Sequence, residues 1–380
     1  MRTTFSTTIV LVVFFAASSA GGQGALSLQG LGYPTGELSA RAEGTGGGVA
    51  DFDALSLVTP ASVARAGSAA VFFQYSPEFR RVTTSAGSAR TTTARFPLVA
   101  GVLPMGQSWT VGLSSSTFLD RSSETSLLRK QRVGDLMDSV TVTERNRVLG
   151  AINDVRLALA WARTPAFRLG VGAHVFTGSN RITFSRLFPD STKYLSTGQT
   201  GRVSYAGLAA SIGVELHPSR AIGFALSGRK GGDLRAESSD TTIGRAPLPD
   251  HYSASVIYEG VAGASISARV AHDGWSSLGS LSSSGIEAFD GWDTGLGFEV
   301  TGPHIMQRII TLRAGARLRT LPFGFNGQKV SETSFAAGFG APLTRERATL
   351  DFAIQRASRS AGSDVKERGF ILSFGLRVSP

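Results

Sequence analysis

Beyond about residue 68, the chain alternates apolar residues with polar or small ones over many successive segments. In 307–319, Leu312 and Leu318 lie on one face of the pattern, and Arg313 and Arg317 lie on the other. A period of two predicts β-strands with one apolar face. Because Arg and Gly recur on the polar face of successive segments, we interpret the pattern as a membrane barrel with apolar residues toward lipid and polar ones toward the lumen.

Turn signals divide this region into about fourteen expected strands. They are 69–83, 89–104, 107–120, 148–163, 166–187, 200–217, 219–238, 249–260, 261–274, 288–302, 307–320, 330–342, 345–358 and 365–378. Short turns with Pro or Gly alternate with long polar connections such as 121–147, 188–199, 239–248 and 275–287. We therefore expect an all-β fold, a transmembrane antiparallel β-barrel with short periplasmic turns and long extracellular loops. We further expect a short helix in 121–147.

Most Trp and Tyr residues fall near the ends of the expected strands. They are Trp109, Trp161, Trp275, Trp292, Tyr75, Tyr205, Tyr252 and Tyr258. Rings with one polar and one apolar part prefer the membrane–water interface, so this pattern predicts aromatic girdles at both ends of the barrel.

The first twenty residues have the pattern of a secretory signal peptide. Arg2 precedes the apolar run 9–17, and Ser18-Ser19-Ala20 supplies the small residues of a cleavage site. Nine apolar residues are too few to span a bilayer as a helix. We expect cleavage of residues 1–20 and export to a bacterial outer membrane. The chain has no cysteine, which excludes disulfides, thiolate metal sites and a lipidated cysteine.

The composition supports a barrel with basic character. Glycine accounts for 46 of 380 residues, only 17% of residues are charged, and the formal net charge is +10. An exported chain is not expected to bind nucleic acid. The cationic excess favours contact with outer-membrane lipid and lipopolysaccharide, or a lumen that attracts anions. We expect a monomer.

Residues 30–66 do not alternate and include several apolar residues, such as Phe52, Leu55 and Val58. They are too apolar for a flexible tail, so we predict that 21–68 forms a periplasmic segment and a hatch inside the lumen. Residues 69–380 would then form the barrel.

This segment resembles the start of the FadL-type outer-membrane transporters of long-chain fatty acids and aromatic hydrocarbons. That family opens with a Gly-rich stretch, an Ala-Asp stretch and Asn-Pro-Ala before strand one. Here the corresponding residues are Gly44 to Gly48, Ala50-Asp51 and Thr59-Pro60-Ala61, with Thr59 in place of the Asn. The resemblance implies fourteen strands and a luminal N-terminal hatch, and it makes a set of residues candidates for gating: Gly44, Gly46, Gly47, Gly48, Asp51, Thr59, Pro60 and Ala61. The chain also resembles the related PorV-type barrels of protein secretion.

Charged side chains on the polar face are candidates for lining the lumen. We single out Arg156, Arg168, His174, Arg313, Arg317 and Asp351. One interpretation is structural, with the arginines paired across strands to Asp293, Glu299 and Asp351, since charges away from water need partners. The other is an electropositive path for carboxylates.

The remaining motifs do not indicate catalysis. The five histidines lack metal-ligand spacing, and the sequence does not show whether His174 or His272 converges with a serine. We expect no enzyme activity, no metal site and no cofactor. The leading hypothesis is passive uptake of a small hydrophobic or amphipathic ligand, either fatty-acid-like or aromatic. The alternatives are a non-transporting platform for protein secretion or assembly and a general polar pore.

Overall fold

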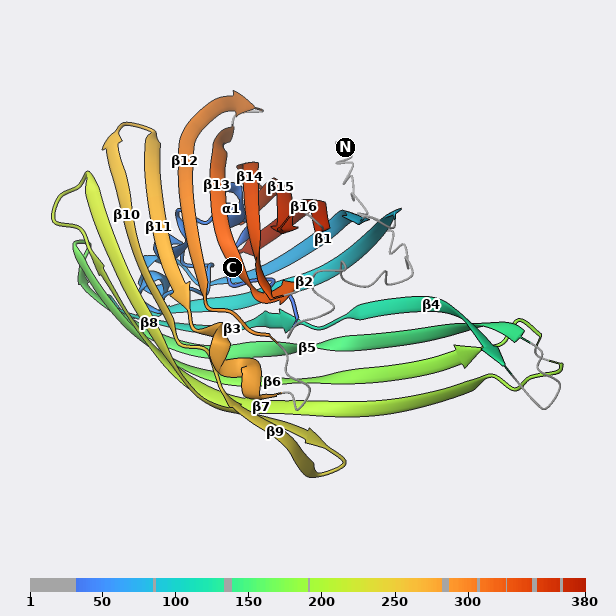
Figure 1. Ribbon diagram of the computed structural model, residues 1–380. Coiled ribbons are helices and arrows are strands. Elements are labelled where there is room, and N and C mark those ends of the chain that lie inside the picture. The colour runs from blue at the N-terminus through green and yellow to red at the C-terminus, as the bar shows by residue number, and fades with distance from the viewer. Residues whose placement is uncertain are drawn as a thin grey trace, which may run out of the picture.

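The computed structural model is a closed β-barrel (Figure 1) and describes residues 32–84, 87–132, 139–190, 192–281, 287–305, 308–325, 327–343, 347–362 and 365–380. In this part of the chain, fourteen strands form the wall: β1 (Ala70–Thr84), β2 (Gly87–Met105), β3 (Trp109–Asp120), β5 (Ser139–Thr164), β6 (Phe167–Leu187), β7 (Thr197–Leu216), β8 (Ile222–Ser238), β10 (His251–Val261), β11 (Ala264–Asp273), β12 (Gly291–Ile305), β13 (Arg308–Phe325), β14 (Gln328–Leu343), β15 (Ala348–Ala361) and β16 (Val365–Val378). The expected signal peptide lies outside the described residues.

Successive wall strands pair antiparallel all the way round the barrel. The ring closes between β8 and β10 and between β1 and β16, where Val71 lies opposite Val378. The antiparallel fourteen-stranded barrel expected from the alternating pattern is therefore confirmed. Two further strands, β4 (Ser123–Arg132) and β9 (Thr241–Pro247), branch from the ring and pair with β5 and β8.

The expected helix in 121–147 is wrong. The described part of that segment forms β4 and the start of β5, which pair in register from Ser123–Val148 to Arg132–Ser139. Four consecutive β-branched residues, Val140 to Thr143, lie at the start of β5, which favours a strand. β4 and the distal parts of β5, β6 and β7 (139–150, 178–187 and 197–204) continue beyond the barrel, and we call this sheet the extension (Figure 1).

The two faces of the wall follow the predicted alternation. On β6, the Val171 side chain is 49% exposed on the outside, whereas His174 is 3% exposed and faces the lumen. On β13, Leu312 is exposed and Arg313 is buried. A closed barrel with an apolar outer wall leaves no unpaired sheet edge in lipid, and this places the protein in a bacterial outer membrane.

Two of the expected girdle residues lie inside the barrel instead. Trp275 begins the 3-10 helix η4 (Trp275–Leu281), and its ring stacks on Phe118 at a centroid distance of 5.1 Å. Tyr205 is buried, and its hydroxyl accepts hydrogen bonds from Arg121 (2.6 Å) and Asn180 (3.2 Å). Trp275 follows the end of β11, whereas Tyr205 lies near the middle of β7, and both are on the luminal side.

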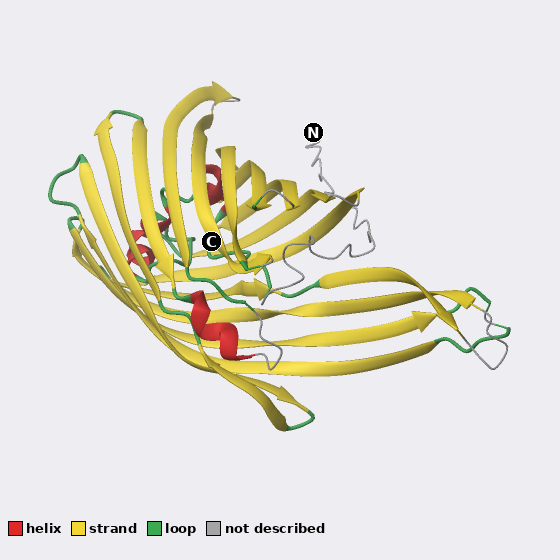
Figure 2. Cartoon of the chain, viewed as in Figure 1, coloured by secondary structure: helices red, strands yellow, loops and turns green. Residues whose placement is uncertain are grey.

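Residues 32–66 lie inside the barrel, and we call them the plug (Figure 2). The plug contains α1 (Ala40–Gly44) and two 3-10 helices, η2 (Ala50–Phe52) and η3 (Ala61–Arg65). α1 packs against β13–β16, η2 against β8 and β10, and η3 against β3 and β5–β7. Among the described residues, no helix has the length and apolar character needed to cross a membrane. The plug therefore contacts the wall on opposite sides of the lumen.

Candidate functional site: the plug and the adjoining cavity

The plug rests directly on the wall backbone where the wall has glycines. A Cβ atom on Gly46, whose φ is +60°, would lie 2.6 Å from the backbone nitrogen and oxygen of Ala316 in β13. A Cβ on Gly315 would overlap the Thr45 backbone, and one on Gly295 of β12 would overlap the Gly46 carbonyl. Only glycine allows this close approach of two backbones. No side chain separates the plug from the wall here.

A second backbone contact involves the Thr59-Pro60-Ala61 segment. A Cβ on Gly170 of β6 would overlap the backbone of Pro60 and Ala61, and one on Gly213 of β7 would overlap the Thr59 hydroxyl. The segment chosen from the sequence as a gating candidate thus touches the wall directly.

The other candidate glycines differ from one another. A Cβ on Gly48 would lie 2.6 Å from the Gly297 nitrogen, so Gly48 belongs to the same tight seat. Gly47 has a φ of +84°, which other residues rarely adopt. Gly44 has only ordinary contacts, with its nearest neighbours, Arg313 and Ala353, at 3.6 Å.

Asp51 fixes the middle of the plug to β10 and β11. Its carboxylate accepts hydrogen bonds from Ser253 (3.0 Å) and Ser255, and it forms an ion pair with Arg269 (3.1 Å). Asp51 and Arg269 are both buried. A buried charge needs such partners, so this contact is a strong anchor.

A chain of alternating charges connects α1 to the next part of the wall. Arg41 pairs with Glu299 (2.6 Å), Glu299 with Arg313 (2.8 Å), and Arg313 with Asp351 (2.5 Å). The predicted cross-strand pairing of Arg313 with Glu299 and Asp351 is confirmed. The plug takes part in it through Arg41.

The remaining luminal candidates also have partners. Arg168 and Arg65 of the plug share Glu215, at 2.5 and 2.7 Å. Arg156 donates to the Leu57 carbonyl of the plug at 2.9 Å. The luminal arginines therefore hold the plug and wall together.

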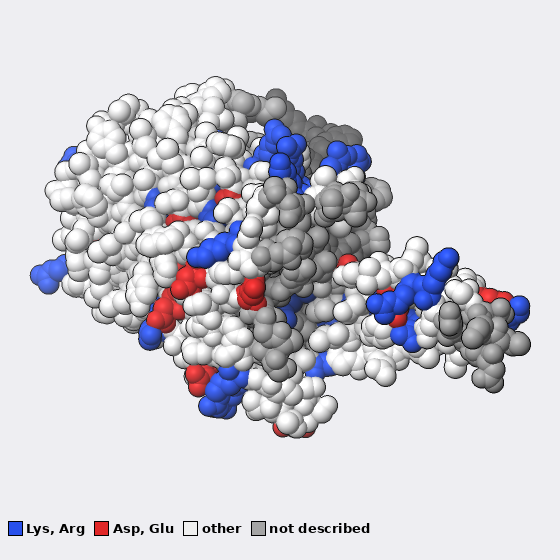
Figure 3. Space-filling model, viewed as in Figure 1, with Lys and Arg blue, Asp and Glu red and all other residues white. Residues whose placement is uncertain are grey.

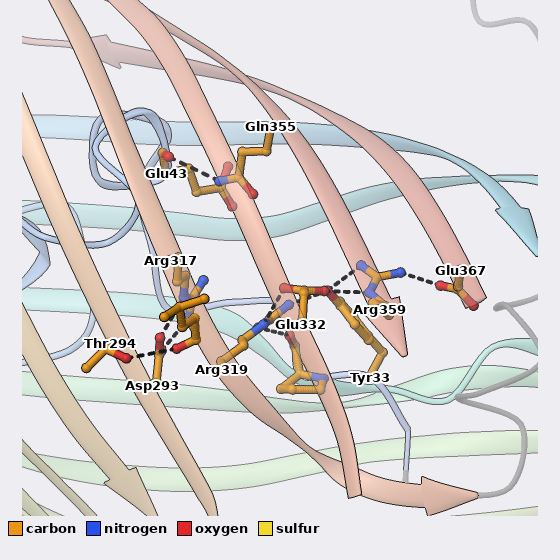
Figure 4. Close-up of polar contacts among 12 residues, drawn as sticks. Tyr33, Glu43, Asp293, Thr294, Arg317, Arg319, Glu332, Gln355, Arg359 and Glu367 are labelled. Carbon is orange, nitrogen blue, oxygen red and sulfur yellow. Dashed lines mark hydrogen bonds and ion pairs between the residues drawn. The ribbon is translucent and has the colours of Figure 1, made fainter. Parts of the chain in front are cut away.

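Tyr33 lies at the centre of a large ionic cluster near the extracellular ends of β14 and β15 (Figure 4). Its hydroxyl donates to Glu332 (2.8 Å) and accepts from Arg319 and Arg359 (2.6 Å). The Arg359 guanidinium also lies 4.5 Å from the centre of the Tyr33 ring. The backbone of Tyr33 forms a bridge with Asp120 of β3. This cluster fixes the first described residues of the plug, and sequence analysis did not identify it.

A cavity lies between the plug and the loop that carries η4. It is small, with a volume of about 70 Å³, and is lined by Leu38 and Val58 of the plug, Phe118 of β3, Trp275 and Trp292. Charged side chains line the other part of the cavity, and they are paired: Arg229 with Glu37 (2.6 Å), Arg317 with Asp293 (2.5 Å) and His251 with Asp273 (2.7 Å).

An apolar cluster, which we call the cap, adjoins this cavity through Phe118 and Trp275. It comprises Phe118, Leu119, Ile152, Phe176, Tyr205, Leu234, Ala236, Ala246, Leu248, Trp275 and Leu278. Its aromatic rings are in contact, with Phe118 4.8 Å from Phe176. Residues of both the cap and the plug therefore line the cavity.

His174 converges with a serine, which the sequence could not show. Its Nε2 lies 2.8 Å from Ser211 Oγ, and its Nδ1 lies 2.8 Å from Asp154. The three residues come from β7, β6 and β5, and all are buried. The arrangement links three adjacent strands, and Asp154 also lies 3.8 Å from Arg229, which lines the cavity.

Several solved structures share this fold. A Pseudomonas aeruginosa FadL homologue aligns with a TM-score of 0.63 at 11% identity, covering 92% of this chain and 99% of that one. The CymD monoaromatic hydrocarbon channel aligns with a TM-score of 0.54 at 14% identity, covering 94% of this chain and 99% of that one. The P. putida toluene transporter TodX aligns with a TM-score of 0.54 at 13% identity, covering 93% of this chain and 98% of that one. No protein-family model and no curated protein sequence matches the chain. The resemblance expected from the N-terminal residues is confirmed in the architecture, and the chain has the fold of the FadL-type outer-membrane transporters.

Proposed function

We propose that the protein takes up a small hydrophobic or amphipathic molecule passively across the outer membrane. The observation that carries this proposal is the partly apolar cavity between cap and plug. Ligand sites are typically concave and largely apolar, with a few oriented polar groups. Solved structures with the same fold include channels for toluene and other monoaromatic hydrocarbons, which supports the proposal.

The charges around the cavity favour a neutral ligand over a carboxylate. Arg229 and Arg317 already hold carboxylates at 2.6 and 2.5 Å, so an anionic ligand would have to compete with Glu37 and Asp293. The rings of Phe118 and Trp275 offer an apolar surface that suits an aromatic ring. We therefore expect aromatic hydrocarbons to be better ligands than fatty acids.

Transport in this scheme requires the plug to shift. At its glycine seats the plug touches the wall backbone, so a ligand in the cavity cannot pass while the plug is seated. The ligand would enter beneath the cap and rest against Trp275. It would leave when the plug moves away from β12 and β13.

The test measures uptake and conductance. Cells that carry the protein should accumulate radiolabelled toluene faster than cells without it, and Trp275→Ala should slow this uptake, whereas Trp109→Ala on the outer wall should not. Deleting 30–58 should raise conductance in planar bilayers and leave the barrel folded. Uptake no faster than in cells without the protein would contradict the proposal.

One feature favours the second candidate, an interaction platform. The extension projects beyond the barrel and exposes Leu127 and Leu128 on β4, at 57% and 77%. Exposed apolar residues on a projecting sheet suit a protein partner. The platform function is correct if deleting residues 123–147 abolishes protein secretion while toluene uptake by the cells is unchanged by the deletion or is absent from the start.

A further inference from the structure

Two unusual pairs of arginines lie at the extracellular side of the protein, one on the extension and one where β9 branches from β8. Arg181 of β6 lies directly opposite Arg202 of β7, and Arg235 of β8 lies directly opposite Arg245 of β9. All four side chains are exposed. Like charges directly opposite each other on adjacent strands are destabilising, because their Cβ atoms are only about 5 Å apart.

These arginines face outward, away from the lumen. Asn180 and Leu234, the residues just before Arg181 and Arg235, are buried inside, and successive side chains of a strand point to opposite faces. Arg181 and Arg202 therefore lie on the same face of β6 and β7 as the exposed Val175 and Leu208.

Of these four arginines, only Arg245 has an acidic side chain within salt-bridge distance among the described residues. Arg202 donates to Ser179 (3.1 Å), and Arg245 has only the exposed Asp233 at 3.6 Å. This contrasts with the lumen, where the arginines of the ion-pair networks hold carboxylates.

The pairs lie just above the apolar part of the outer wall. Arg181 is six residues beyond the exposed Val175, and Arg202 is six residues from the exposed Leu208. With about 3.3 Å per residue and a strand tilt near 45°, the arginines lie about 14 Å beyond these side chains. The barrel wall seen in Figure 3 is largely free of charge, and Lys and Arg gather on the extension.

We propose that these arginine pairs bind the phosphate groups of lipopolysaccharide in the outer leaflet. Phosphate accepts charge-assisted, bidentate hydrogen bonds from guanidinium groups, and one phosphate between two arginines offsets their repulsion. Lipopolysaccharide carries phosphates on its lipid A and inner-core sugars, just above the acyl chains. The site depends on the barrel and its orientation, and not on what passes through the lumen.

The test compares binding of purified, phosphorylated rough lipopolysaccharide to the mature protein in detergent. We expect Arg181→Gln/Arg202→Gln and Arg235→Gln/Arg245→Gln each to weaken binding roughly tenfold. The control, Arg129→Gln/Arg186→Gln, removes two arginines from the opposite face of the extension, where both lie near Glu144. It should bind like the parent protein. Migration of the unheated and heated protein in gels checks that each variant is folded.

Two further ligands identify what is recognised. The first is the same lipopolysaccharide after dephosphorylation. Its affinity for the parent protein should be as low as the affinity of the arginine variants for intact lipopolysaccharide. Phosphatidylglycerol should bind weakly to the parent and to both arginine variants alike. The proposal is overturned if dephosphorylated ligand binds as well as the intact one, if the control loses as much affinity as the test variants, or if phosphatidylglycerol shows the same losses.

Discussion

The plug is held by two different kinds of contact. Along Gly46–Gly48 and Thr59–Ala61 it touches the wall backbone to backbone, whereas at Asp51 and Tyr33 it is held by charges and hydrogen bonds. A backbone contact on glycine tolerates no added atom. A charged contact can exchange one partner for another or for water. The comparison indicates that the glycine seat determines where the plug fits and that the charged anchors determine how firmly it stays.

The largest effect should come from filling the glycine seat. In Gly315→Val the new side chain would overlap Thr45, and we expect an unfavourable change of more than about 3 kcal/mol in plug seating, the upper end for overpacked sites. Planar-bilayer recordings should show a large rise in conductance. Gly201→Val is the control, because no atom lies within 4 Å of a Cβ there. A Gly315→Val barrel that is folded and as closed as the parent would refute the backbone seat.

Removing the buried anchor should have the next largest effect. Asp51→Ala takes away the closest carboxylate of Arg269, whose other carboxylate, Asp293, lies at 3.4 Å. Losing one member of a buried pair costs about 3 kcal/mol, so the plug should leave its seat more often. Protease cleavage within residues 32–66 of the folded protein measures this directly. Equal cleavage of parent and variant would show that Asp51 does not hold the plug.

A smaller effect is expected at the ionic cluster. Tyr33→Phe removes the hydroxyl bonded to Glu332, Arg319 and Arg359 but leaves the ring and the charges in place. We expect a loss of about 1–2 kcal/mol. Hydrogen exchange of the amide of Tyr33, which is bonded to the Asp120 carbonyl, should speed up accordingly. No change in this exchange would mean that the charges alone hold the segment.

The smallest effect should depend on pH. Burial in the plug raises the pKa of Glu43 to about 7, and Glu43 Oε2 has no hydrogen-bond partner among the residues that the structure describes. Glu43 therefore stays protonated up to about pH 7 when the plug is seated. When the plug leaves its seat, the Glu43 carboxyl is exposed to water and loses its proton above about pH 4.5. Plug seating should weaken as pH rises from about 5 to 8. Glu43→Gln should remove this dependence, and conductance recorded across that range tests it.

The sequence predicted the wall better than the plug contacts. Alternation identified the strands because lipid and lumen impose opposite demands on neighbouring residues such as Leu312 and Arg313. It assigned β4 and β9 to the long connections 121–147 and 239–248, because a strand that branches from the wall has no lipid to make one of its faces apolar. Residues 44–61 were recognised as luminal from their glycines and apolar residues. Their partners were not predictable, since contacts such as Asp51 with Arg269 join residues more than two hundred positions apart.

The seam between β1 and β16 has a consequence for assembly. It joins the two ends of the wall, since Val71 lies opposite Val378, and the plug comes directly before β1 in the chain. Every wall strand that the plug touches is made after the plug itself, and α1 packs against the last four strands. Contacts of such long sequence separation form slowly. We therefore expect α1 to reach its seat only when the final strands are in place, whereas η3 can pack earlier against β3 and β5–β7, so that sealing of the lumen finishes together with the barrel.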